Sequence, residues 1–137
     1  MSTSQEPRES TVLTVRTEIV ALNIQNQKLS ILVIKRAAPP FKGQLMLPGG
    51  FIRPEEGLVE AATRQLATEV TFPIGAIQIE QLAAYGRIDR DPRMRALSIA
   101  YLAVVPALSK PCAEEEASDA YWQVVETESR LRWAFDH

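Results

Sequence analysis

The sequence has few of the features that mark secreted, membrane-spanning or strongly basic proteins. Its single cysteine, Cys112, cannot form an internal disulfide, so a reducing compartment is expected. No segment approaches the roughly 18 consecutive apolar residues of a membrane span. Fifteen Lys and Arg against seventeen Asp and Glu give a net charge of −2, which argues against a strongly basic nucleic-acid surface. Residues 1–10 lack the apolar core of a signal peptide and are expected to form a disordered leader.

The composition that remains is that of an ordinary globular domain. Hydrophobic residues make up 46% of the chain and charged residues 23%. A length of 137 residues favours a single domain, which should bury roughly two-thirds of the surface of the unfolded chain. These features together predict a cytoplasmic, single-domain α/β protein.

The hydrophobic pattern predicts a mixed sheet with one helix. Strands are expected at residues 11–24, 29–35, 45–47, 77–85, 96–105 and 120–125, with polar loops at 87–93 and 110–118. The polar residues 25–28 predict an antiparallel hairpin between the first two strands. Because strands precede and follow a single helix, the order favours a mixed sheet over repeated βαβ units.

One helix is expected from Pro54 to about Val70. Apolar residues recur there at spacings of three and four, which places them on one face: Leu58, Ala61, Ala62, Leu66 and Val70. Pro54 suits a first helical position, and Pro73 lies just beyond the end. A single helix leaves the other face of the sheet bare, so we expect either a second helix that is missing or truncated after residue 137, or a partner subunit.

The segment from Gly50 to Phe72, GFIRPEEGLVEAATRQLATEVTF, resembles the Nudix hydrolase signature. Gly50, Glu56, Arg64, Leu66 and Glu69 match this signature with its spacing intact. A Leu-Pro-Gly-Gly lead-in also resembles the usual approach of the family. The resemblance implies a Nudix fold for residues 11–137, with the C-terminus of the domain truncated.

Members of this family split a nucleoside diphosphate linked to another moiety, using Mg²⁺ or Mn²⁺. The resemblance implies catalytic roles for Glu69, Glu56 and Arg64, with Glu69 as a metal ligand and Glu56 as a possible second one. Gln65 and Thr68 stand where the signature has two further carboxylates, and neither side chain carries a charge. Hard divalent cations prefer several carboxylate oxygens, so this departure predicts activity that is weak or lost and leaves open that no metal is used. We expect Glu56 and Arg64 to form a structural ion pair.

A second resemblance is carried by residues 85–102, YGRIDRDPRMRALSIAYL, and by the ending AFDH at 134–137. Both are similar to NrtR-type transcriptional regulators of NAD metabolism, in which a Nudix domain senses ADP-ribose or a related nucleotide. This implies a homodimer, and contact with DNA only through a C-terminal winged helix that this chain does not contain. Active ADP-ribose pyrophosphatases are related as well.

Five residues are candidates for contacting such a ligand: Arg36, Gly49, Gly50, Arg90 and Arg93. The glycine pair permits close approach of the backbone, and arginines offer bidentate donors to phosphate. The alternatives are an exposed Arg36 capping a strand, and a solvated loop in which Arg90 and Arg93 pair with Asp89 and Asp91.

Several other residues have two interpretations each. Phe41 and Tyr85 either stack on an adenine or belong to the core or rim. The acidic run 114–116 is either a solvated loop or, with Glu126, the source of a catalytic base. His137 is interpreted as incidental and not catalytic, and Cys112 receives no catalytic role.

Three functions therefore remain open: a sensor that binds ADP-ribose with little chemistry, a Mg²⁺-dependent hydrolase, and a structural dimerisation domain.

Overall fold

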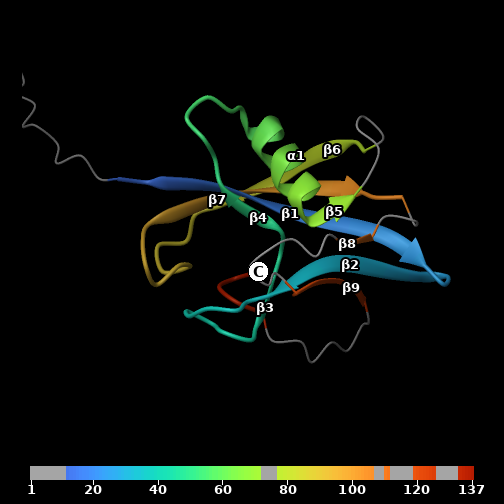
Figure 1. Cartoon of the computed structure of the whole chain (residues 1–137). Helices are drawn as coiled ribbons and strands as arrows, with labels where there is room; N and C mark the ends of the chain where they lie inside the picture. Colours follow the sequence, from blue (N-terminus) through green and yellow to red (C-terminus); the bar gives the residue numbers. More distant parts are fainter. Residues whose placement is uncertain (1–11, 72–76, 107–109, 112–118, 126–132) are drawn as a thin grey trace, which may run out of the picture.

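The computed structural model describes residues 12–71, 77–106, 110–111, 119–125 and 133–137. Along the chain, the elements are β1 (Thr14–Gln25), β2 (Lys28–Lys35), β3 (Leu45–Met46), β4 (Gly49–Phe51), α1 (Leu58–Glu69), β5 (Val70–Thr71), β6 (Ile79–Tyr85), β7 (Ala96–Val104), β8 (Lys110–Pro111) and β9 (Asp119–Val124). Figure 1 shows α1 lying against a large twisted sheet. Within the described residues, no helix is long and apolar enough to cross a membrane.

The sheet is mixed, as the sequence predicts. Its order is β3-β2-β1-β7-β6, with β4 paired to β1 and β9 paired to β2. The long strand β1 runs parallel to β7 and antiparallel to β2 and β4. Asn26 and Gln27 connect β1 to β2 with φ angles of 50° and 64°, the left-handed conformation that two-residue hairpin turns require. The predicted hairpin is therefore confirmed.

The apolar stripe of α1 packs against one face of the sheet. Ala62, Leu66 and the following Val70 join Ile19 and Ala21 of β1 in a fully buried core. Side chains alternate between the two faces of a strand. Odd-numbered residues of β1 therefore face α1, whereas even-numbered residues such as Glu18 face the opposite side.

The helix is shorter than the sequence suggests. It begins at Leu58 and not at Pro54, because Gly57 is the extended N-cap residue, with φ −75° and ψ 169°. The preceding residues form a turn, in which the Glu56 N–H donates to the Arg53 carbonyl at 3.1 Å. The predicted helix start at Pro54 is therefore wrong.

Three short strands were missed or misjudged by the pattern. Gly49–Phe51 pairs with β1 as β4, although its diglycine predicts a turn. Val70–Thr71 pairs with Lys110–Pro111, where the sequence predicts a helix end and a polar loop. Two- and three-residue strands give no alternating pattern, so tertiary pairing decides them.

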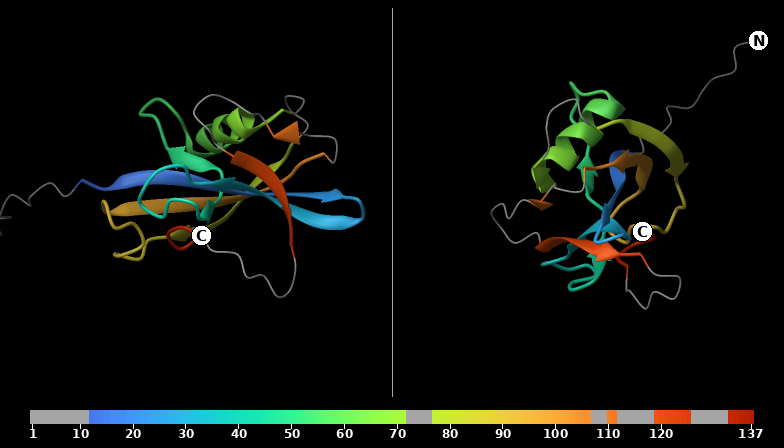
Figure 2. Two further views of the ribbon diagram at one scale, coloured as in Figure 1. Left: turned by 60° about the horizontal axis from the view of Figure 1, so that its bottom comes forward. Right: turned by 90° about the vertical axis from the view of Figure 1, so that its right-hand side faces the viewer.

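The opposite face of the sheet carries exposed apolar residues and the C-terminal segment. Leu82, Tyr85 and Val104 are each at least half exposed. Residues 133–137 lie on this side, away from α1 (Figure 2, left), and are tied to β3 by the Ala134 N–H, which donates to the Leu45 carbonyl at 2.7 Å. Part of the face expected to be bare is thus covered by the chain itself. The expected leader, the acidic run 114–116, Cys112 and Glu126 lie outside the described residues.

Candidate functional site

The segment from β4 to α1 is held by a bidentate ion pair between Glu56 and Arg64. Arg64 Nε lies 2.6 Å from one Glu56 oxygen, and Arg64 Nη2 lies 2.9 Å from the other. The Arg53 N–H also donates to Glu56, at 2.9 Å. The hydrogen bonds from the Arg64 side chain, together with the one from the Arg53 N–H, lower the pKa of Glu56 to about 2. The predicted ion pair is present, and it commits both carboxylate oxygens of Glu56.

Gln65 points from α1 into the core and not toward solvent. Gln65 is only 5% exposed, and its side-chain oxygen accepts a hydrogen bond from the Thr17 hydroxyl on β1. Its amide group donates to the Phe51 carbonyl at 3.4 Å. Both ends of the side chain are thus engaged by neighbouring strands.

Two further positions of the signature, Thr68 and Glu69, lie at the end of α1. Thr68 is exposed, and its hydroxyl donates back to the Gln65 carbonyl at 2.7 Å, a bond within the helix itself. Glu69 is partly buried and makes a polar interaction of its own. Among the described residues, no group of three or more His, Cys, Asp or Glu side chains is arranged to hold a metal ion.

Gly49 and Gly50 belong to β4 and pair with β1, and their Cα atoms are directed toward opposite faces of the sheet. A Cβ atom on Gly49 would overlap the Glu18 carboxylate and the Thr17 carbonyl, so the chain needs glycine there. Gly50 pairs with Thr17, and a Cβ atom on it would make ordinary contact with Gln65. The diglycine therefore lets β4 approach β1 closely, with the Gln65 amide on one side and the Glu18 carboxylate on the other.

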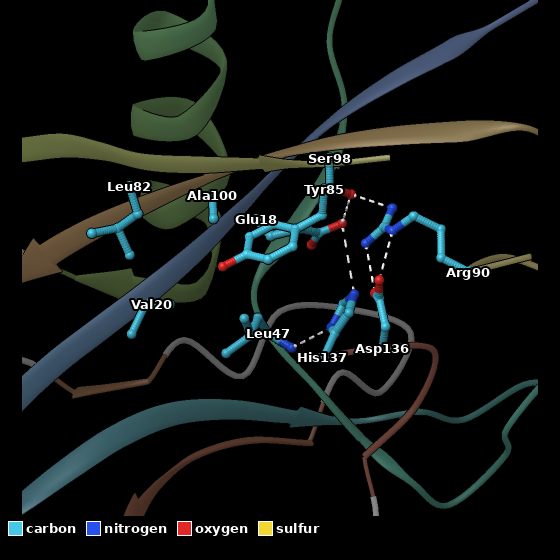
Figure 3. A pocket seen from close by; sticks show the side chains of 10 residues that line it. All are labelled: Glu18, Val20, Leu47, Leu82, Tyr85, Arg90, Ser98, Ala100, Asp136 and His137. Carbon is cyan, nitrogen blue, oxygen red and sulfur yellow. Dashed lines mark hydrogen bonds and ion pairs between the residues drawn. The ribbon is translucent and has the colours of Figure 1, made fainter. Parts of the chain in front are cut away.

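A cavity of about 170 Å³ opens on the face opposite α1 (Figure 3). Its polar lining consists of Glu18, Arg90, Ser98, Asp136 and His137. Its apolar lining consists of Val20, Leu47, Leu82, Tyr85 and Ala100. The cavity thus joins β1, β6 and β7 to the C-terminal segment.

A chain of hydrogen bonds runs through the polar side of this cavity. Arg90 donates through Nε and Nη2 to the two Asp136 oxygens, at 2.9 and 2.7 Å. Its Nη1 donates to the Ser98 hydroxyl at 2.7 Å, and that hydroxyl donates to Glu18 Oε1 at 3.2 Å. Arg16 Nε donates to the same Glu18 oxygen at 2.9 Å. Burial raises the pKa of Glu18, and Arg16 and Ser98 oppose that rise.

His137 closes the cavity on the side of the C-terminal segment. Its Nδ1 accepts the Leu47 N–H at 3.0 Å, so in the neutral ring Nε2 carries the hydrogen. Nε2 lies 3.8 Å from Glu18 Oε1, too far for a hydrogen bond. Burial lowers the pKa of His137 to about 4. The side chain of His137 is only 4% exposed and ties the C-terminal segment to Leu47, in the lead-in of the diglycine, so its role is structural at least. The interpretation that His137 is not catalytic stays a prediction.

Arginines gather beside the cavity, around the ring of Phe135. Arg36 and Arg93 lie over this ring, 4.9 and 5.2 Å from its centre. Burial, together with the charges of Arg93 and Arg16, lowers the pKa of Arg36. Arg36 donates to the Pro40 carbonyl at 2.7 Å, whereas Arg16 and Arg93 have carboxylate partners. We refer to Arg16, Arg36 and Arg93 as the arginine cluster.

The sequence predicted these arginine environments only in part. Arg93 pairs with Asp91 at 2.9 Å, as one alternative had it, but Arg90 pairs with Asp136 and not with Asp89. Arg87 takes Asp89 at 2.7 Å. Sequence reasoning could not find a pair separated by 46 residues, because only the fold brings the loop and the C-terminal segment together.

The two aromatic candidates, Phe41 and Tyr85, lie in different surroundings. Phe41 packs edge-on against Phe135, with ring centres 4.9 Å apart, while Tyr85 is 51% exposed at the cavity. Glu18 was missed altogether. The available signal was an acidic residue inside an apolar strand, which a buried site would explain.

The domain is an α/β unit in which a diglycine and one helix lie on a mixed sheet. The family model of the NUDIX domain matches residues 14–137, and the chain belongs to this family. It is similar to the ADPR-responsive transcriptional repressor NtrR of Acinetobacter baylyi, with 28% identity over 122 residues, covering 88% of this chain and 48% of the relative.

Two further relatives extend the comparison. The ADP-ribose pyrophosphatase of Methanocaldococcus jannaschii is 37% identical over 108 residues, covering 78% of this chain and 60% of that protein. The NUDIX domain of Shewanella oneidensis NrtR, solved in complex with ADP-ribose, superposes with a TM-score of 0.79 at 29% identity, covering 98% of this chain and 87% of that one. The chain thus spans about half the length of the curated repressor.

Proposed function

We propose that this domain binds ADP-ribose, or a closely related nucleoside diphosphate derivative, as a sensor with little or no hydrolytic activity. The observation that carries the proposal is the placement of Gln65. Its amide is neutral, buried, and hydrogen-bonded at both ends to Thr17 and Phe51. A metal ligand at this position would be a carboxylate with free oxygens, whereas Gln65 is an uncharged amide whose oxygen and nitrogen are both hydrogen-bonded.

The remaining donors do not fit a divalent cation that requires several carboxylates. Both Glu56 oxygens are taken by Arg64, and Thr68 offers a hydroxyl that donates within the helix. This leaves Glu69 as the acidic residue of the signature that Arg64 does not hold. Because Mg²⁺ and Mn²⁺ prefer several oxygen ligands with negative charge, the donor set supports binding without efficient metal-dependent cleavage.

We infer the ligand from the positive charge of the arginine cluster and from the ligands named for related proteins. The arginine cluster offers guanidinium groups that match phosphate oxygens. The cavity beside it shares Glu18, Arg90 and His137 with a smaller recess that Arg16 and Phe135 line. A related domain was solved with ADP-ribose, and the related repressor is described as ADPR-responsive. We further propose that the domain is the sensor of such a regulator, with its DNA contacts outside these 137 residues.

Calorimetry and a turnover assay on the same sample test this function. ADP-ribose is titrated into the protein in Mg²⁺ and again in EDTA, while phosphate-coupled turnover is measured in Mg²⁺. We expect binding in both buffers and no turnover above the protein-free rate. Turnover that requires Mg²⁺ and is abolished by Glu69→Gln would establish the alternative, an ADP-ribose pyrophosphatase; absence of binding in both buffers would refute both functions.

A pair of matched variants locates the phosphates. Arg36→Gln should weaken ADP-ribose binding about 10- to 100-fold, because it removes a charged donor from the arginine cluster. Arg87→Gln makes the same chemical change at an exposed residue paired with Asp89, and should leave the affinity unchanged. Equal affinities for the two variants would place the diphosphate elsewhere.

A further inference from the structure

The C-terminal segment contacts three arginines that the sequence nominates for binding a ligand. The Phe135 ring lies against Arg36, which follows β2, and against Arg93, from the loop before β7. The next residue, Asp136, accepts two hydrogen bonds from Arg90 of the same loop (Figure 3). Two adjacent residues of the segment are therefore held by side chains that lie far from them in the sequence.

The Phe135 ring is the surface on which two like charges meet. The guanidinium carbons of Arg36 and Arg93 lie 4.9 and 5.2 Å from its centre, within the range in which the face of an aromatic ring attracts a cation. Arg36 also donates to the Pro40 carbonyl at 2.7 Å and to the Met46 sulfur at 3.4 Å, and neither group carries a charge. The ring thus helps to hold Arg36 close to a second arginine.

Phe135 occupies this position in an unusual backbone conformation. Its φ is 55°, in the left-handed region that a bulky residue rarely adopts. Phe41, with a φ of 61°, packs edge-on against it, with ring centres 4.9 Å apart. Such conformations persist where the surrounding contacts determine them, and they are common in ligand-binding and switch regions. The contacts of the ring, and not the local preference of the backbone, therefore set the position of the segment.

Backbone groups beside Phe135 report whether the segment is docked. Ala134 is fully buried, and its N–H donates to the Leu45 carbonyl at 2.7 Å. At the other end of the segment, His137 Nδ1 accepts the Leu47 N–H at 3.0 Å. Because Ala134 adjoins Phe135, a change in the contacts of the ring is expected to alter how often the Ala134 hydrogen bond opens.

We propose that Phe135 is a positioning residue that couples the diphosphate of the ligand to the C-terminal segment. This inference rests on the proposed function, in which the arginine cluster binds the diphosphate. Because a guanidinium group donates in its own plane, a phosphate bound at its edge leaves its face on the ring and holds it there. Ligand binding thus fixes the segment more firmly, and by linkage the docked segment raises the affinity for the ligand by the same factor. Ligand occupancy is thereby converted into the position of residues 133–137.

Amide hydrogen exchange followed by NMR tests the coupling on the unaltered protein. Exchange of the Ala134 amide is measured without ligand and with saturating ADP-ribose. The reference is the Val125 amide, which donates to the Leu29 carbonyl at 2.9 Å where β9 meets β2. We expect the ligand to slow exchange at Ala134 about 5-fold or more, and at Val125 less than about 2-fold. Binding without slowing at Ala134, or with equal slowing at both amides, would overturn the coupling and leave the proposed function intact. Absence of ADP-ribose binding would overturn the proposed function, and this inference with it.

Matched variants assign the coupling to the aromatic face. Phe135→Leu keeps an apolar side chain without that face, so ADP-ribose should bind about 5- to 20-fold more weakly and should no longer slow exchange at Ala134. Phe135→Tyr keeps the face and should restore both properties, and Tyr121→Leu, on β9, should leave both unchanged.

A merely structural ring gives a different result. Phe135→Leu would then speed exchange at Ala134 by the same factor with and without ligand, so the slowing caused by the ligand would persist, and this outcome would overturn the proposal. If Phe135→Leu does not fold, as judged by circular dichroism, the exchange comparison on the unaltered protein decides.

Discussion

Restoring the missing carboxylate of the signature should destabilise this domain. Gln65 donates to the Phe51 carbonyl at 3.4 Å and is 5% exposed. Gln65→Glu loses that donor, at a cost of about 1 kcal/mol, and places a charged oxygen beside a carbonyl oxygen. The variant can avoid burying this charge if the new carboxyl group is protonated in the folded state. With an unfolded pKa of about 4.3, protonation at pH 7.5 costs about 4 kcal/mol, which sets the upper limit.

The expected loss of unfolding free energy is therefore between about 1 and 4 kcal/mol at pH 7.5. Burial raises the pKa of the new carboxyl in the folded state, so the penalty is absent below the unfolded pKa and grows as pH rises toward the folded one. The assay is urea unfolding in EDTA at several pH values between 4.5 and 7.5. Thr68→Glu, at an exposed position, is the matched control and should stay within about 0.5 kcal/mol of the unaltered protein. A Gln65→Glu protein as stable as the original at pH 7.5 would refute the view that this position belongs to the core.

Three further outcomes follow from the cavity and the diglycine. Asp136→Asn should lower stability by about 2–4 kcal/mol in urea unfolding, because it leaves the buried Arg90 without its bidentate partner; a loss below 0.5 kcal/mol would show that the pair is dispensable. Gly49→Ala should cost at least about 3 kcal/mol, since its Cβ would overlap the Glu18 carboxylate, and unchanged stability would contradict that close approach. The His137 ring should titrate by NMR with a pKa of about 4. Because this pKa is below the unfolded value, the residue contributes about 3 kcal/mol to the free energy of unfolding above pH 6.5, and this contribution is lost as pH falls from 6.5 toward 4. A measured pKa near 6.5 would place the ring in solvent.

The sequence was informative wherever local pattern and packing agree. The spacing of Ala62, Leu66 and Val70 predicted the buried stripe of α1, and the alternation of apolar residues predicted the long strands. The helix start was misplaced because Pro54 suits a first helical turn, yet the ion pair of Glu56 with Arg64 holds a turn there instead.

The cavity was beyond sequence reasoning for a different reason. It forms where β1, β7 and the C-terminal segment meet, and the contacts that define it join residues 46 to 90 positions apart: Arg90 with Asp136, Ser98 with Glu18, and Leu47 with His137. No periodicity links such residues: the parallel pairing of β1 with β7 brings Ser98 near Glu18, and the other two contacts depend on where the C-terminal segment lies. Glu18 alone gave a local hint, as an acidic residue inside an apolar strand.

A titration with Mn²⁺, followed by the paramagnetic resonance signal of the free ion, probes the donor set of the helix most directly. It is run on the protein without ligand, and again with ADP-ribose after subtraction of the ions that ADP-ribose binds by itself. We predict that the protein removes no Mn²⁺ at micromolar concentrations in either case, since Gln65 is turned into the core and Glu56 is held by Arg64. Stoichiometric uptake of Mn²⁺ that Glu69→Gln abolishes would contradict this account.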